Sequence, residues 1–294
     1  MIRGLPLTAD FNSVSAYILS LPNLETLTLH STNLTGSISN PSNCTAQLKE
    51  LDISSNGLNG SVSDAVSLAD SCPSLQSLNL SDNFIGQAFN SFSPVWPRIK
   101  MLDLSYNKIV SNRDLQWLFS NLGLLKYLDL SNNNIQGTMP PISNCTSLQH
   151  LDMSTNQLIG TIPSEIKACT SLVALILSNN NFSSEIPILP LLNMPRLEHL
   201  DLAFNNFNGS LPKSISNLTS LECLDLSANK LLGQIPPSLC TDGVSRLKLL
   251  HLQDNFLTGH IPNSLSNCSN LVSLDLSFNL FLGPYPALWD LSLS

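Results

Sequence analysis

The chain has few charged residues, few aromatic residues and no long apolar run. Charged side chains make up 12% of its 294 residues, and 13 basic against 21 acidic residues leave a formal net charge of −8. An acidic chain without a basic patch is poorly suited to nucleic acid or to an anionic membrane surface. The longest apolar stretch, near residues 186–194, is too short and too rich in proline to span a bilayer. The first fourteen residues also lack the apolar segment of a signal peptide.

Motifs for catalysis and for cofactor binding are absent as well. The sequence contains no G-x-G-x-x-G, H-R-D or D-F-G element of a kinase. Its seven cysteines show no CxxC and no paired Cys/His spacing of a metal site. His150 and His199 each precede an aspartate by two residues, but no nucleophile and no oxyanion turn accompany them. We therefore expect no enzymatic activity, no cofactor and no metal.

What the chain does contain is one unit, LxxLxLxxNxLxG, written eleven times at steps of 23 to 27 residues. A period in the twenties with this leucine pattern predicts a leucine-rich-repeat solenoid. The units begin at Leu24, Leu48, Leu75, Ile99, Leu125, Leu148, Leu172, Leu197, Leu221, Leu247 and Leu271.

Each unit predicts one short strand and one buried asparagine. Alternation along Leu128-Asp129-Leu130 points both leucines into the coil and places the aspartate on a concave outer surface. No coil can bury its apolar face alone, so neighbouring coils must stack. An inward amide at the ninth position can pair with the backbone groups that the turn leaves free, and only Thr32 replaces it. The ten asparagines are Asn56, Asn83, Asn107, Asn133, Asn156, Asn180, Asn205, Asn229, Asn255 and Asn279.

After the asparagine, most units continue with a glycine and then an apolar residue and proline, as in Gly160 to Pro163. Glycine allows a sharp turn, and proline favours an extended return path over a regular helix. This tail resembles the plant-specific class of leucine-rich repeats. We expect a right-handed superhelical solenoid of the α/β repeat class, with short strands and irregular or 3-10 convex segments. It should form one domain over 1–294, with full repeats at 24–286 and partial repeats at 1–23 and 287–294.

Three segments narrow the resemblance further: 7–29, 107–119 and 238–279 resemble repeats of the brassinosteroid receptor kinase ectodomain. The resemblance implies the N-terminal half of an extracellular hormone receptor, which is expected to be a piece of a longer protein because neither end supplies a polar cap. In that family the steroid lies between a late island insertion and the last repeats, and a co-receptor kinase docks nearby. This chain contains no such island, so no hormone-binding residue carries over. We expect no steroid binding by these residues alone, and membrane attachment only through segments outside them.

The cysteines and the N-x-S/T sequons lead to predictions about thiol packing and about glycosylation. Five cysteines recur just before their unit's first leucine, which favours inert packing thiols; Cys145 and Cys169 could pair only if their Cα atoms lie within about 7 Å. Cys240 has no obvious partner, and Cys223 is expected on the concave face. Nine N-x-S/T sequons fit a secreted, glycosylated protein, although Asn79 would place a glycan on the concave strands. The other eight are Asn33, Asn43, Asn59, Asn144, Asn181, Asn208, Asn217 and Asn267.

The concave face offers two candidate contact features. Aspartate fills the fifth position in seven units, either as an acidic patch or, the interpretation we favour, as solvated side chains bonded to neighbouring Ser and Asn. An apolar strip in units seven to eleven is either a partner site or a set of single exposures. Its members are Ala174, Ile176, Phe204, Cys223, Leu249, Val272 and Phe278.

The sequence thus predicts an extracellular recognition scaffold with a protein or peptide partner and no nucleic acid. Two alternatives stay open. One is a different plant receptor-like protein that binds peptides on the concave face of units seven to eleven. The other is a stand-alone inhibitor or structural protein of the cell wall.

Overall fold

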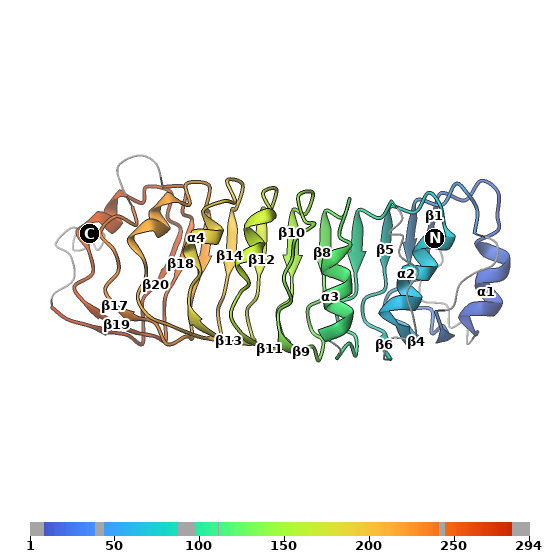
Figure 1. Ribbon diagram of the computed structural model, residues 1–294, viewed down its shortest axis with the longest axis horizontal. Helices are drawn as coiled ribbons and strands as arrows, with labels where there is room; N and C mark the ends of the chain where they lie inside the picture. The colour runs from blue at the N-terminus through green and yellow to red at the C-terminus, as the bar shows by residue number, and fades with distance from the viewer. Residues whose placement is uncertain (1–8, 39–43, 88–97, 111, 241–244, 284–294) are drawn as a thin grey trace, which may run out of the picture.

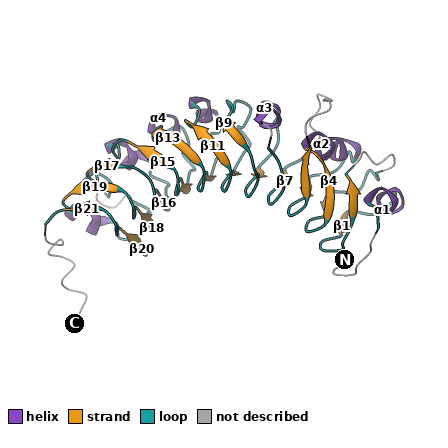
Figure 2. Cartoon of the chain, turned by 90° about the horizontal axis from the view of Figure 1, so that it is seen from below, coloured by secondary structure: helices purple, strands orange, loops and turns teal. Residues whose placement is uncertain are grey.

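The computed structural model describes residues 9–38, 44–87, 98–110, 112–240 and 245–283. Over these residues the chain winds into a row of stacked coils (Figure 1). Seen from below, the row forms an arc with its helices on the outer, convex side (Figure 2). Residues 1–8 of the predicted partial repeat at 1–23, and the whole of the one predicted at 287–294, lie outside the described residues.

One parallel sheet lines the inner, concave side of the arc. Each strand is three residues long, and its central residue pairs with the central residue of the next strand, as Leu151 does with Leu175. In spatial order the strands are β1 (Thr26–Thr28), β3 (Glu50–Asp52), β5 (Ser77–Asn79), β7 (Met101–Asp103), β8 (Tyr127–Asp129), β10 (His150–Asp152), β12 (Ala174–Ile176), β14 (His199–Asp201), β16 (Cys223–Asp225), β18 (Leu249–His251) and β20 (Ser273–Asp275). The one-strand-per-unit prediction is confirmed.

Three smaller parallel sheets follow the inner strands along the coils. They are β2 (Thr35–Ser37), β4 (Gly57–Ser61) and β6 (Phe84–Gln87); β9 (Gln136–Thr138), β11 (Gln157–Gly160), β13 (Asn181–Glu185) and β15 (Asn206–Asn208); and β17 (Leu232–Gly233), β19 (Phe256–Gly259) and β21 (Leu280–Phe281). The repeat glycine ends or follows many of these strands with positive φ, +80° at Gly160 and +75° at Gly209. A Cβ on Gly209 would lie 2.7 Å from Cγ of Glu185 in the neighbouring coil. A larger residue there would force the coils apart.

The convex side is more helical than the sequence predicted. Segments α1 (Phe11–Ile18), α2 (Val62–Ser71), α3 (Asn112–Ser120) and α4 (Ile188–Leu191) are α-helical, whereas η1 (Ser164–Ala168), η2 (Lys213–Asn217) and η3 (Asn263–Asn267) are 3-10 turns. The expectation of an irregular or 3-10 path is therefore wrong for α2 and α3. Their units, of 27 and 26 residues, are among the longest. Helix α2 starts with a capping box of Ser61 and Asp64 in place of the Ile-Pro pair.

A continuous apolar core runs through all the described coils, made mainly of the leucines of the repeat. Beside it runs the asparagine ladder. Asn229 is typical: its amide donates to the carbonyls of Leu202, Leu226 and Ser227, and its Oδ1 accepts from the backbone N–H of Phe207. Each amide thus joins its own coil to the preceding one, as predicted. Thr32 joins the same network through its side-chain hydroxyl, which donates to the carbonyl of Leu29 and to Oδ1 of Asn56.

The cysteines correct the sequence prediction. Six of the seven form disulfides between adjacent coils rather than packing as inert thiols, and Cys240, which had no obvious partner, is bonded to Cys268. The pairs are Cys44–Cys72, Cys145–Cys169 and Cys240–Cys268, with Cα–Cα distances of 5.1, 4.7 and 5.2 Å. Only Cys223 is a free thiol. The recurrence that suggested a packing position therefore marks covalent links between neighbouring coils.

Candidate functional site

The concave sheet is hollowed over strands β10 to β18. The hollow has a volume of about 470 Å³, within the range of small-ligand and peptide sites. Most of its exposed lining is apolar. The lining residues are His150, Ala174, Ile176, His199, Leu200, Asp201, Cys223, Asp225 and Leu249.

The hollow exists because of two short side chains in the row of first strand positions. That row reads His150, Ala174, His199, Cys223 and Leu249 on consecutive paired strands. Ala174 is 8% exposed, since the longer side chains of the neighbouring strands flank it. Strand β12 also carries Ile176 in the second row, where its neighbours carry Asp152 and Asp201. An apolar floor is thereby bordered by carboxylates.

The aspartates of the second row are bonded within their own turns, and Asp201 is also bonded to the preceding coil. Asp225 Oδ1 accepts from the backbone N–H and the hydroxyl of Ser227, at 3.0 and 2.6 Å. Asp201 accepts from the N–H of Ala203 and, through Oδ2, from the hydroxyl of Ser178. This local bonding supports the interpretation of the aspartates as part of the repeat's own strand-turn structure.

Burial makes several of these carboxyls harder to ionise. It raises the pKa of Asp152 from 3.8 to about 6, against the hydrogen bonds from Ser154 and with a further upward contribution from the charges of Asp129 and Asp201. The pKa values of Asp103 and Asp201 are raised for the same main reason. Asp152 therefore changes its charge in the weakly acidic range rather than well below it.

Next to the hollow, on the side of β8, the concave face is filled. The ring of Tyr127 stacks on His150 with centroids 4.4 Å apart, and its hydroxyl donates to Asp129 at 3.3 Å. Burial lowers the pKa of the His150 imidazole and raises that of the Tyr127 hydroxyl. Strand β12 separates His150 from His199, as the sequence spacing predicted. The free thiol of Cys223, on the strand paired with that of His199, also lines the hollow, and burial raises the pKa of this thiol, which disfavours the reactive thiolate.

The predicted apolar strip is not one surface. Ala174, Ile176 and Leu249 line the hollow together with Cys223. Phe204 and Phe278, by contrast, lie in the turns after their strands with φ +52°, and Val272 precedes β20. These three are 58%, 83% and 86% exposed and belong to the edges of the sheet. Their assignment to concave strand positions is wrong, because Val272 lies one residue before β20, and Phe204 and Phe278 lie three residues after the ends of β14 and β20.

In the sequence, His150 and His199 were considered only as catalytic candidates, and Asp201 and Asp225 as part of an acidic patch or as solvated side chains. All four residues border the hollow. The repeat register could have found them, since equivalent positions of successive units lie side by side. The register alone does not predict the depth of the hollow, because that depth depends on the small side chains at Ala174 and Cys223.

The candidate glycosylation sites lie mostly away from the hollow. Asn33, Asn144, Asn181, Asn208, Asn217 and Asn267 are exposed, and Asn59 is half-buried in β4. Asn79 lies on the concave face in β5, where its Oδ1 accepts from Ser81. Asn43 lies outside the described residues. Glycosylation at these positions stays a prediction.

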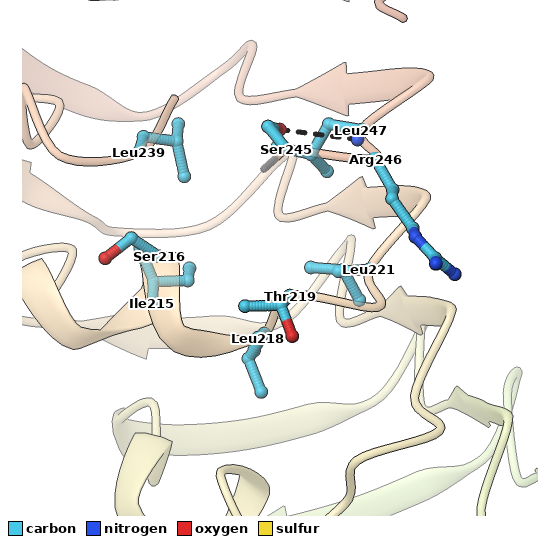
Figure 3. Close-up of a pocket in the computed structure, with 9 residues that line it drawn as sticks. All are labelled: Ile215, Ser216, Leu218, Thr219, Leu221, Leu239, Ser245, Arg246 and Leu247. Carbon is cyan, nitrogen blue, oxygen red and sulfur yellow. Dashed lines mark hydrogen bonds between the residues drawn. The ribbon is translucent and has the colours of Figure 1, made fainter. Parts of the chain in front are cut away.

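A second cavity lies on the convex side, between η2 and the next coil (Figure 3). Its volume of about 20 Å³ is enough for roughly one water molecule and no more. In the described part of the chain, no three His, Cys, Asp or Glu side chains gather as a metal site. Nor does any described helix have the length and apolar character needed to cross a bilayer.

Family models match most of the chain. The model described as "Leucine rich repeat" matches 73–135 and 170–231, and related models match 124–168, 47–68 and 246–268. Together these ranges make up more than half of the sequence and coincide with the coils. The chain belongs to the leucine-rich-repeat proteins.

The curated proteins similar to this chain include plant receptor kinases. The brassinosteroid LRR receptor kinase BRI1 of Oryza sativa subsp. japonica is 42% identical over 49% of this chain and 13% of its own length. Protein BRASSINOSTEROID INSENSITIVE 1 of Arabidopsis thaliana is 34% identical over 64% of this chain and 14% of its own length. The chain therefore spans about one seventh of these relatives.

Solved structures of plant receptors share the fold. The peptide hormone receptor RGFR1, in complex with RGF2, matches with a TM-score of 0.74 and 30% identity over 90% of this chain and 41% of its own. The TDR receptor matches with a TM-score of 0.71 and 28% identity over 95% of this chain and 51% of its own. The predicted solenoid is thus confirmed, and so is the resemblance to plant receptor kinases.

Proposed function

We propose that the chain is part of the extracellular recognition scaffold of a plant leucine-rich-repeat receptor of the brassinosteroid-receptor type, and that it binds a protein or peptide segment in the concave hollow. The hollow over β10 to β18 carries the proposal, because it is an apolar, carboxylate-bordered depression of ligand size on an otherwise polar sheet. The identity to the rice and Arabidopsis receptors supports the receptor type. The RGFR1–RGF2 complex supports a peptide as the class of partner.

Covalent chemistry supports an extracellular location. Disulfides persist in oxidising compartments, and three of them join adjacent coils here. Together with the nine sequons, they support an extracellular site, as a receptor ectodomain or in the cell wall. We propose no catalytic role for this chain, since binding alone accounts for the hollow. A co-receptor kinase is a further proposed partner of the whole receptor.

A random peptide display library tests the proposal. The chain is expressed as a secreted, disulfide-bonded protein, and enriched peptides are assayed against two variants. Ala174→Tyr fills the hollow, whereas Thr26→Tyr places the same side chain at the equivalent, exposed position of β1. Enriched peptides should bind the wild type and Thr26→Tyr alike and lose most of their affinity for Ala174→Tyr. Equal binding to all three proteins would reject the hollow as the recognition site.

Steroid binding is tested separately. A sterol needs to be enclosed on most of its surface, and an open hollow on a curved sheet does not enclose it. Calorimetric titration of this chain with brassinolide should therefore give no saturable heat. Saturable binding in the micromolar range would contradict the proposal, and Ile176 and Leu249 would be the first contacts to substitute.

A further inference from the structure

The floor of the hollow has a regular relief. Along the first row of concave positions, long and short side chains alternate from strand to strand: His150, Ala174, His199, Cys223, Leu249. The two short positions make two depressions, with the exposed His199 standing between them. A ligand that lies across the strands meets a depression at every second strand.

The distance between the two depressions selects a peptide conformation. Neighbouring strands lie about 4.8 Å apart, so positions two strands apart are about 9.6 Å apart. An extended β-peptide repeats a side chain on one face every two residues, roughly 6.7 Å, which does not match. A polyproline II helix has three residues per turn and rises about 3.1 Å per residue, so its side chains at i and i+3 lie on one face about 9.3 Å apart. That spacing matches the distance between the two depressions.

The backbone of the sheet favours the same conformation. The inner strands use their peptide groups on one another: the N–H of His199 donates to Val173, and that of Leu202 donates to Asp225. Added β-strand pairing is therefore available only at the ends of the sheet and not in the hollow, which lies in its interior. A polyproline II segment needs no such partners, because its recognition relies on side-chain contacts.

The charged residues at the border of the hollow favour a cationic ligand. Asp201 and Asp225 are paired neighbours in the second row, and both line the hollow. The nine lining residues include no lysine or arginine. The nearby Lys248 is held by Glu222 at 2.6 Å, and His251 Nδ1 is 3.3 Å from Asp225 Oδ2. The border of the hollow is thus complementary to a cationic side chain.

We propose that the hollow binds a cationic peptide in the polyproline II conformation, crossing the strands with small apolar side chains at i and i+3 over Ala174 and Cys223 and a lysine or arginine beside Asp201 and Asp225. The inference deepens the proposed recognition function and rests on it. It adds to that function a ligand conformation, a side-chain spacing and a charge.

Three synthetic peptides of equal length test it by fluorescence anisotropy with the full chain. The first, Pro-Pro-Val-Pro-Arg-Val-Pro-Pro, places valines at i and i+3. The second moves one valine to give an i, i+2 spacing with the same composition, and the third replaces arginine by glutamate. We expect saturable binding of the first peptide and at least about tenfold weaker binding of the other two. Indistinguishable affinities for the first and second peptides, or no binding of the first at millimolar concentration, overturn the inference.

Variants assign the binding to the hollow. Cys223→Tyr fills a half-buried depression and Asp201→Asn removes one charge, and each should weaken the first peptide at least about tenfold. Thr26→Tyr should not. Because Ala174 is buried and its replacement can disturb the sheet, thermal melting of every variant accompanies the titrations.

The two proposals fail in different ways. If display-selected peptides lose affinity for the filled hollow but show no preference for i, i+3 spacing, the site recognises peptides in another conformation. In that case only the polyproline inference fails. If no peptide of either origin responds to filling the hollow, the proposed function fails as well.

Discussion

Two halves of one concave sheet differ in relief although their backbones are the same. Over β7, β8 and β10 the first row holds Met101, Tyr127 and His150, and the tyrosine and histidine rings stack face to face. Over β12 to β18 the same row alternates long side chains with Ala174 and Cys223, and the surface is hollowed. Register and strand length do not change between the halves. The shape of the concave surface is thus set by side-chain size at a few strand positions.

The convex side also differs from unit to unit while the inner sheet stays the same. Three units in which an Ile-Pro or Leu-Pro pair follows the glycine form short 3-10 turns, and Pro163, Pro212 and Pro262 immediately precede η1, η2 and η3. The longer units that lack the pair form α2 and α3. Neither difference reaches the inner sheet, because the asparagine ladder and the leucine core lie between the two surfaces.

The largest expected effect concerns a covalent link at the junction of the two halves. Cys145–Cys169 joins the coils of β10 and β12 and closes a loop of 24 residues. The double variant Cys145→Ala/Cys169→Ala should lose about 3–4 kcal/mol of unfolding free energy, by the chain-entropy relation for that loop length. Chemical denaturation measures it. Cys223→Ala, which removes a free thiol, should change stability by much less; an equal loss would contradict the disulfide.

The asparagine ladder is common to both halves, so breaking it should cost the same in each. Asn133 and Asn229 each donate to three carbonyls and accept one backbone N–H, and both are buried. Replacement by alanine leaves these groups unpaired, for a loss of at least about 2–3 kcal/mol at either position. Denaturant melts of Asn133→Ala and Asn229→Ala measure it. A loss at one position only would show that the two halves differ in more than their surfaces.

Most of the fold could be predicted from the sequence, because the repeat period and its leucine pattern directly indicate a leucine-rich-repeat solenoid. The leucines, the asparagine ladder and even the exception at Thr32 behave as the pattern indicates. The disulfides could not be predicted, because pairing depends on distances between coils that the spacing in sequence does not give. The α-helices of the convex side were missed because one proline-containing tail was taken as typical of all units.

The candidate site could be predicted only in part. Ala174, Ile176 and Leu249 were named from the strand alternation, and they do line the hollow. Phe204 and Phe278 were named with them but lie in left-handed turns beyond the strands. The pattern of apolar residues in the strands therefore predicts where the surface lies. The depth of the hollow depends on differences in side-chain size between equivalent positions of neighbouring units.

A smaller effect should appear at Asp152, which borders both halves. Its folded-state pKa of about 6 lies above the ordinary 3.8, so the folded protein holds a proton that the unfolded chain releases. Stability from this group is present below about pH 4 and is lost as pH rises through about 6. Asp152→Asn should therefore stabilise the protein at pH 7 by on the order of 1–3 kcal/mol and change little at pH 4. Melts at the two pH values measure it, and a destabilised variant at pH 7 would contradict the assignment.

The smallest effect concerns the stack that fills the N-terminal half of the sheet. Tyr127→Phe keeps the ring on His150 and loses only the 3.3 Å hydrogen bond to Asp129, so stability should change by less than about 0.5 kcal/mol. Tyr127→Ala removes the ring and should cost about 0.5–1.5 kcal/mol. Because burial lowers the pKa of His150, exposure in Tyr127→Ala should raise that pKa toward its ordinary value, whereas Tyr127→Phe should not. Titration of the imidazole by NMR distinguishes them, and an unchanged pKa in Tyr127→Ala would mean that the stack does not shield His150.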